Sequence, residues 1–224
     1  MTAGSNKSYY DAIAGVYDRI DAADPSNREV RDKVMNIFLT HVKGKKVLDF
    51  GGGTGLDLSW LTGHGFEVTF CEPSEKMRDQ AKNRQIKDIR FLDHAASDFN
   101  TWQYHSPFPE KMDAVLSNFA VVNNIDKPGK LFSALAGATK PGAMVVLTIL
   151  DPLPMRKRTG LFSRLLNAVS GRPTSMILHQ GQEHQAVYVH AVETLAKNAG
   201  PWFTLEKQEN VNGFGFLCLV FVRN

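Results

Sequence analysis

The sequence predicts an α/β fold, in which helices alternate with the strands of a mainly parallel sheet. Three observations support this. Lys45 to Leu61 reads as a short apolar strand, a glycine-rich turn and a segment with helical spacing. Strand-like and helix-like runs then alternate as far as Leu150. Near the end, Leu217 to Val222 contains no polar residue, which is typical of a strand inside a sheet.

The chain is organised around the stretch from Lys45 to Leu56, KKVLDFGGGTGL. Its glycines allow positive φ angles and let a ligand approach the backbone closely. The helix that follows offers unpaired N–H groups and a partial positive charge. In an open α/β sheet, ligands bind at the carboxyl ends of the strands. The stretch therefore predicts a site for a polar ligand at the end of the first strand.

The glycine spacing does not fit a phosphate ligand. The dinucleotide fingerprint requires glycines at relative positions one, three and six, but Leu56 is the sixth residue counted from Gly51 and Leu58 the sixth from Gly53. A phosphate-binding loop would end in Gly-Lys-Ser or Gly-Lys-Thr, whereas Leu56 and an aspartate follow Gly55. A further carboxylate, Asp49, stands two residues before the first glycine. A carboxylate suits a cationic ligand group better than a pyrophosphate.

A second acidic residue follows the next predicted strand. The run Phe66 to Cys71 reads as a strand and ends at Glu72 and Pro73. An acid at the end of the second strand, about 20 residues past the glycine loop, accepts hydrogen bonds from ribose hydroxyls. Glu72 fits that role, and the alternative is an acid that merely begins the next helix.

These two motifs resemble those of the class I S-adenosylmethionine (SAM)-dependent methyltransferases. In that family the glycine loop carries the methionine end of SAM, and an apolar residue such as Met77 lies against the adenine. The resemblance covers about residues 9 to 222 and is most specific at the first motif. It implies a Rossmann-like, seven-stranded, mostly parallel sheet in the order 3-2-1-4-5-7-6, with strand 7 antiparallel and helices on both faces.

The resemblance also suggests further contacts with the cofactor. The pattern Tyr-Asp-x-x-Ala-x-x-Tyr-Asp, from Tyr10 to Asp18, is similar to the N-terminal cap of small-molecule methyltransferases, in which Tyr17 lies over SAM. Packing of Tyr17 on the core is the equal alternative. Asp93 is the candidate for the adenine amino group, against a loop that makes backbone contacts only. The expected cofactor-binding residues are Tyr17, Asp49, Gly51, Gly53, Gly55, Glu72, Pro73, Met77, Asp93, Ser117, Asn118 and Phe119.

The remaining elements follow from local patterns along the chain. Ser26 followed by Glu29 three residues later predicts a capping box at a helix start, and the β-branched run before Leu150 predicts a strand. Helices are expected over Tyr9–Ile20, Ser26–His41, Leu56–Gly63, Ser74–Arg84, Lys127–Thr139 and Ala186–Ala199. Strands are expected from Val47 and over Phe66–Cys71, Ile89–Leu92, Met112–Leu116, Ala143–Leu150, Trp202–Gln208 and Phe214–Val222.

We interpret residues 1–224 as a single domain with an N-terminal helical cap at about 9–43 and an insertion at about 151–185. The insertion follows the fifth strand, where family members often carry substrate-specifying segments. It holds several basic residues and an apolar stripe from Leu161 to Val169. Three interpretations stay open: a solvated helix packed on the domain, a lid over the pocket of the methyl acceptor, and a membrane-surface helix.

The expected chemistry requires little acid–base catalysis. Displacement at a sulfonium methyl group depends mainly on alignment and on exclusion of water, and a base is needed only if the nucleophile loses a proton. Candidate bases are His179, His184 and His190, with Tyr188 no stronger. A lone histidine is more often a surface or structural residue, so the catalytic residue is unknown. No metal site is expected.

The sequence therefore predicts a methyltransferase that converts SAM into S-adenosylhomocysteine (SAH) while methylating a small-molecule acceptor. One alternative is a SAM-binding regulatory or partner subunit without turnover. Another is an oxidoreductase that uses NAD or a nucleotide sugar, against which the glycine spacing counts. A formal charge of +3 gives no strong case for nucleic acid, and no apolar run is long enough for a stable membrane insertion. We expect a cytoplasmic monomer or homodimer with two buried thiols.

Overall fold

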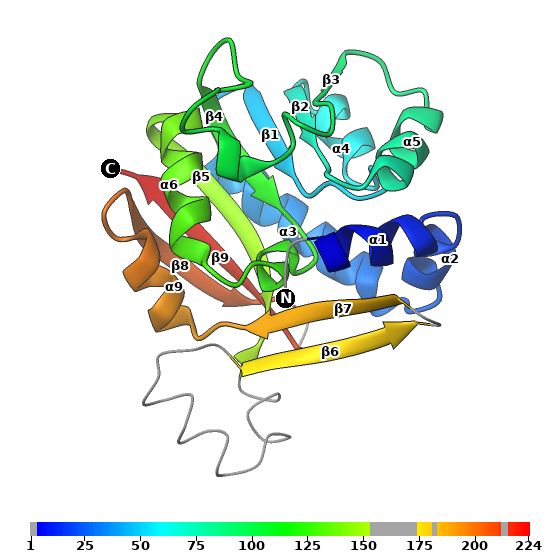
Figure 1. Cartoon of the computed structure of the whole chain (residues 1–224). Coiled ribbons are helices and arrows are strands. Elements are labelled where there is room, and N and C mark those ends of the chain that lie inside the picture. Colours follow the sequence, from blue (N-terminus) through cyan, green and yellow to red (C-terminus); the bar gives the residue numbers. More distant parts are fainter. Residues whose placement is uncertain (1–3, 153–173, 181–182, 212–214) are drawn as a thin grey trace.

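The computed structural model describes residues 4–152, 174–180, 183–211 and 215–224. Its main sheet has the strand order β3-β2-β1-β4-β5-β9-β8 (Figure 1). The strands are β1 Lys46–Phe50, β2 Glu67–Cys71, β3 Ile89–Phe91, β4 Met112–Ser117, β5 Thr139–Leu150, β8 Phe203–Asn210 and β9 Phe216–Arg223. Only β9 runs antiparallel to its neighbours, β5 and β8. Numbered within this sheet alone, the order is 3-2-1-4-5-7-6, which confirms the predicted fold class.

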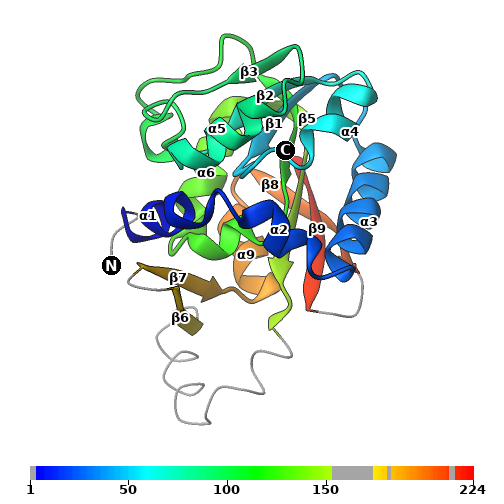
Figure 2. The ribbon, with the colours of Figure 1, turned by 90° about the vertical axis from the view of Figure 1, so that its right-hand side faces the viewer.

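Helices cover both faces of the sheet (Figure 2). One apolar core joins α3 (Ser26–His41) and α4 (Leu58–Gly63) to the strands, with α5 (Glu75–Asn83) contributing Ala81. The core on the other face is built from α6 (Pro128–Ala138) and α9 (Val192–Ala199). The inner parts of β5 and β9 are buried on both sides, which explains their continuously apolar sequences, whereas the edge strand β8 alternates between buried and exposed residues.

The N-terminal segment forms two helices where the sequence analysis expected one. Helix α1 spans Gly4–Ile13 and α2 spans Tyr17–Ala22, with a turn at residues 14–16 between them. Gly15 lies in this turn, and glycine is a poor residue for a helix interior. The break brings Asp18 to the glycine loop, where it accepts a hydrogen bond of 2.5 Å from the Thr54 hydroxyl. The short helix α2 therefore closes over the loop.

Three local expectations need correction. Residues 186–189 belong to strand β7 (Glu183–Val189), and α9 begins only at Val192. β7 pairs antiparallel with β6 (Thr174–Gln180), and valines suit such a strand. The predicted capping box is wrong: the N-cap of α3 is Pro25, and Ser26, the first residue of the helix, donates its N–H to the Asp24 carboxylate. Helix α4 begins at Leu58, after a turn at 55–57. The stripe Leu161–Val169 lies outside the described residues.

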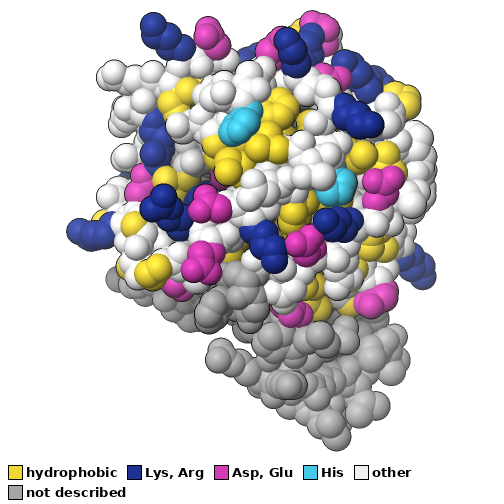
Figure 3. Space-filling model, turned by 180° about the vertical axis from the view of Figure 1, so that it is seen from behind, with side chains coloured by type: hydrophobic (Ala, Val, Ile, Leu, Met, Phe, Trp, Pro, Cys, Tyr) yellow, Lys and Arg dark blue, Asp and Glu magenta, His cyan; other side chains and the backbone are white. Residues whose placement is uncertain are grey.

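The β6–β7 ribbon lies beside α1, at the end of the sheet where β1, β2 and β4 reach their carboxyl ends (Figures 1 and 2). Asn6 of α1 fixes this contact because its side chain exchanges two hydrogen bonds with the backbone of Ala186 in β7. On the face of the molecule seen from behind the view of Figure 1, basic and acidic side chains are interspersed (Figure 3). In the described part of the chain, no helix is both long and apolar enough to cross a membrane.

Candidate functional site

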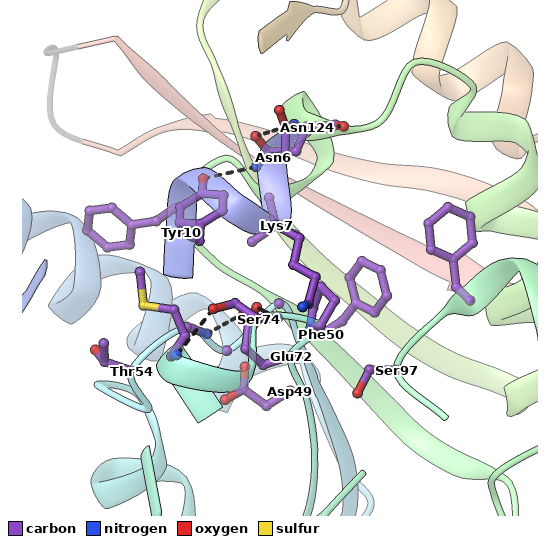
Figure 4. Close-up of a pocket in the computed structure, with 18 of the residues that line it drawn as sticks. Asn6, Lys7, Tyr10, Asp49, Phe50, Thr54, Glu72, Ser74, Ser97 and Asn124 are labelled. Atoms are coloured by element: carbon purple, nitrogen blue, oxygen red, sulfur yellow. Dashed lines mark hydrogen bonds between the residues drawn. The ribbon is translucent and has the colours of Figure 1, made fainter. Parts of the chain in front are cut away.

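A cavity of about 660 Å³ lies at the carboxyl ends of β1, β2 and β4, and α1 and α2 contribute residues to its wall (Figure 4). It is the place where the two sequence motifs meet. Of the residues predicted to bind a cofactor, most line it: Tyr17, Asp49, Gly51, Gly53, Glu72, Pro73, Met77, Asn118 and Phe119.

Three predicted residues do not line the cavity. Gly55 packs inward, since a Cβ atom there would come within 2.7 Å of Leu58 and 2.9 Å of Ala81. Ser117 is buried in β4. The carboxylate of Asp93 accepts a hydrogen bond from the backbone of Ala96 within its own loop.

The loop after β3 reaches the cavity through neighbouring residues instead. His94 and Ala95 line it, followed by residues 97–101. One ring nitrogen of His94 lies 3.2 Å from the carbonyl oxygen of Pro73. At the position expected for an adenine, this loop therefore presents a histidine and an alanine to the cavity. The Asp93 carboxylate does not reach it.

The glycine loop is shaped by close packing on one side and open space on the other. Gly51 and Gly53 have φ angles of 72° and 59°, which favour glycine. A Cβ atom on Gly51 would lie 2.4 Å from Val121, whereas one on Gly53 would meet nothing within 4 Å. Because Gly53 lines the cavity, the space beside it is ligand space. Its N–H is held by Glu72.

Glu72 is buried at the end of β2 with 6% of its surface exposed. One carboxylate oxygen accepts from the backbone N–H of Gly53 at 2.9 Å and the other from that of Ser74 at 2.8 Å. Burial raises its pKa to about 7, although these two hydrogen bonds oppose the shift. The carboxylate is therefore oriented by the backbone, and ligand hydroxyl groups that donate to it would favour its charged form.

Asp49 is the most deeply buried acid of the cavity, with 1% of its surface exposed. Its Oδ2 atom has no hydrogen-bond partner within the described ranges. Burial, together with the nearby carboxylates of Asp57 and Glu72, holds the pKa of Asp49 well above its usual range. A carboxyl group that has one oxygen without a partner and lies near other acids is held in its neutral form unless a cation lies nearby. It fits a cationic group bound beside the glycine loop.

A polar network holds the β4 end of the cavity. The guanidinium of Arg31 pairs with Asp57 at 2.9 Å and with Asp21 at 3.0 Å. It also lies 4.2 Å from the ring centroid of Phe119. The amide of Asn118 donates to the Asp57 carboxylate and accepts from the backbone N–H of Phe119. These contacts fix Phe119 in a positive-φ conformation of 54°, which a phenylalanine rarely adopts.

Sequence reasoning missed several cavity residues. Asp57 follows the glycine loop directly, and Tyr10 begins the aromatic pattern of the N-terminal segment, so both had a signal that could have been used. Arg31, Asn6 and Asn124 had none, because each reaches the cavity through tertiary packing of an element distant in the sequence. Periodicity assigned the helix that carries Arg31 but gave no indication that this residue would face a cavity.

The candidate bases whose side chains the structure describes do not line the cavity. His190 is buried and its Nε2 lies 2.9 Å from the carbonyl oxygen of Ile125, and burial lowers its pKa. Neither His184 nor Tyr188 is among the lining residues, although the backbone oxygen of Tyr188 accepts from Asn123. The side chain of His179 lies outside the described part of the structure.

The fold and this site define a class of protein, and comparison with known proteins identifies that class. The strand order and the glycine loop beside Asp49 and Glu72 are those of a class I SAM-dependent methyltransferase. A family model described as "Methyltransferase domain" matches residues 21–200, so the chain belongs to that family.

Curated relatives carry a common name. A demethylmenaquinone methyltransferase from Clavibacter sepedonicus is 26% identical over 161 residues, which are 69% of this chain and 62% of the relative. The enzyme of the same name from Tropheryma whipplei (strain Twist) is 29% identical over 63% of this chain and 57% of its own length. The matched region therefore spans about three fifths of these relatives.

Solved structures with the same fold cover nearly all of the chain. The DhpI complex with SAH superposes with a TM-score of 0.73 at 16% identity, covering 99% of this chain and 97% of that one. A SAM-dependent methyltransferase from Clostridium acetobutylicum gives 0.67 at 15% identity, covering 96% and 99%. At these identities the likeness concerns the fold.

Proposed function

We propose that this chain transfers a methyl group from SAM to a small-molecule acceptor and releases SAH. The observation that carries the proposal is the pair of buried carboxylates on either side of the glycine loop. Asp49 has one buried oxygen without a hydrogen-bond partner among the described residues, and Glu72 is oriented by two backbone N–H groups. The first suits the cationic methionine end of SAM and the second suits the ribose hydroxyls.

Bound SAM would supply an electrophilic methyl group on a sulfonium. The residues of this chain would hold and orient the reactants. Gly53 leaves space against the backbone, Met77 offers an apolar surface for the adenine, and Phe119 closes the β4 side of the cavity. Tyr10 and Tyr17 belong to the apolar cluster around Met77 and cover the site from the N-terminal helices. Alignment and exclusion of water are the main requirements of this displacement.

The acceptor class is supported by the cavity and by the relatives. Phe50, Phe99, Phe119, Val121 and Ile125 give the cavity an apolar and aromatic lining, which suits a ring-bearing acceptor. The curated relatives are named for demethylmenaquinone, a naphthoquinone. A naphthoquinol is therefore the first acceptor to test.

Two measurements test the proposal. Calorimetry with SAM and SAH tests the cofactor site, and formation of SAH from SAM in the presence of reduced 1,4-naphthoquinone, in parallel with a panel of other small acceptors, tests turnover. Binding without SAH formation across the whole panel would favour the alternative of a SAM-binding partner subunit. Absence of SAM and SAH binding in a folded protein would contradict the proposal itself.

A further inference from the structure

The phenol of Tyr10 stands at a junction of three elements. Its ring lines the cavity from α1 (Figure 4), and its oxygen lies beside the side-chain amides of Asn124 and Gln185. Gln185 of β7 donates to it through Nε2 at 2.7 Å. Asn124, from the short helix η2 (Val121–Asn124), donates to it through Nδ2 at 3.2 Å. Neither amide nitrogen can accept the hydrogen of the phenol.

The orientation of these amides is fixed from the backbone outward. Asn6 accepts from the N–H of Ala186 at 2.8 Å and donates to its carbonyl oxygen at 3.0 Å, so its amide can face only one way. Its Nδ2 also donates to the Oδ1 atom of Asn124 at 3.3 Å. The Nδ2 of Asn124 must therefore be the atom that faces Tyr10.

The same constraint applies to the second amide. The Nε2 of Gln185 lies 2.7 Å from the Oδ1 atom of Asn124, which is an acceptor only, so a donor must stand there. Both hydrogen bonds to the Tyr10 oxygen are thus donated by the amides. Within the part of the chain that the structure describes, no acceptor is recorded for the phenol hydrogen. Burial also raises the pKa of Tyr10 above its ordinary value, so the phenol keeps this hydrogen.

We propose that Tyr10 is a positioning residue whose hydroxyl donates a hydrogen bond to an oxygen atom of the methyl acceptor. The inference rests on the proposed function and adds a requirement to it: the acceptor carries a hydroxyl or carbonyl oxygen near the carbon or heteroatom that is methylated. The β6–β7 ribbon and α1 together set the direction of this donor. The ribbon therefore contributes to acceptor specificity through Gln185, although Gln185 itself does not line the cavity.

The test uses the full chain saturated with SAH and two ring probes of similar shape. Calorimetry measures the affinity of 1,4-naphthoquinone, which has carbonyl oxygens, and of naphthalene, which has none. We expect Tyr10→Phe to weaken 1,4-naphthoquinone about threefold to tenfold, the usual value of one neutral hydrogen bond. The affinities of naphthalene and of SAH should stay unchanged. Gln185→Leu should weaken 1,4-naphthoquinone less, because it removes one of the two amides that orient the phenol.

Tyr9→Phe is the matched control, since it removes the same hydroxyl one residue away, at a side chain that does not line the cavity. It should leave both probe affinities at the parent values. An equal loss for both probes in Tyr10→Phe, or a parent SAH complex that binds neither probe or both alike, would overturn the inference. An equal loss of SAH affinity would assign the Tyr10 hydroxyl to the cofactor instead. Absence of SAH binding to the parent protein would count against the proposed function, which keeps the two failures distinct.

Discussion

The carboxylate of Glu72 accepts a hydrogen bond of 2.9 Å from the backbone N–H of Gly53, so the second strand holds the glycine loop of the first. The two sequence motifs are therefore one structural unit. A ligand that touches the loop also lies within reach of the acid that shapes it. Substitutions at Gly53 and at Glu72 test the two parts of this unit separately.

Gly53→Val should abolish SAM binding in a folded protein. Its side chain would occupy the open space beside the loop, and the φ angle of 59° is unfavourable for valine. Gly65→Val is the matched control, because Gly65 has a φ angle of 78° and similarly open surroundings but does not line the cavity. Calorimetry with SAM on both variants separates ligand exclusion from backbone strain. Parent-like SAM affinity in folded Gly53→Val would contradict the site assignment.

The raised pKa of Glu72 predicts how binding depends on pH. With a pKa of about 7 in the folded chain against an ordinary pKa of 4.5, the folded state holds more protons between these values. The folded state favours the neutral carboxyl. The contribution of Glu72 to folding stability is therefore fully present below pH 4.5 and is lost as the pH rises through 7. Ribose hydroxyls donate to the charged form, so SAH affinity should increase as the pH rises through about 7, where the folded carboxyl ionises.

Calorimetry with SAH between pH 5.5 and 8.5 measures this dependence. Glu72→Gln should flatten it and should weaken SAH by about tenfold at high pH, the usual value of a charge-assisted hydrogen bond. Glu75→Gln makes the same change at an exposed residue of α5 and should behave like the parent protein. A parent protein whose SAH affinity does not change across this range would show that Glu72 does not titrate on binding.

Arg31→Met should destabilise the folded chain by about 3–5 kcal/mol, because it leaves Asp57 and Asp21 without their cation in a largely buried site. The side chain of Arg31 is 16% exposed and that of Asp57 is 8% exposed. Urea unfolding measures the effect. Arg28→Met, at an exposed position of the same helix, should change stability by less than about 0.5 kcal/mol. Equal stabilities of the two variants would mean that the network contributes little.

The sequence was sufficient for the sheet and for the cofactor side of the cavity because both depend on local patterns. Asp49, Gly53 and Glu72 stand at the ends of apolar runs, and parallel strands bring such ends to one edge. The break between α1 and α2 was missed because one aromatic periodicity continues through Gly15. Helical spacing alone does not reveal where tertiary contacts, such as that of Asp18 with Thr54, interrupt a helix.

The acceptor side could not be predicted for a different reason. Asn6, Asn124 and Gln185 are far apart in the sequence and meet where α1, η2 and the β6–β7 ribbon come together. An amide side chain carries no periodic signal, and residues 186–189 were assigned to a helix. A contact between three elements depends on where each lies in space, which local propensity does not determine.

Asn6→Ala tests whether docking of the ribbon serves the acceptor rather than the cofactor. The change removes both hydrogen bonds with the backbone of Ala186, and it frees the amide of Asn124 to turn. We expect the KM for the acceptor to rise and turnover to fall, because the donor at Tyr10 loses its fixed direction. SAH affinity should stay within about twofold of the parent, since the hydrogen bonds recorded for Asn6 in the described residues go to Asn124 and Ala186 and not to the glycine loop or Glu72. Calorimetry with SAH and steady-state kinetics with reduced 1,4-naphthoquinone measure the two effects separately. A parallel loss of SAH affinity and turnover would mean that α1 and the ribbon support the cofactor site instead.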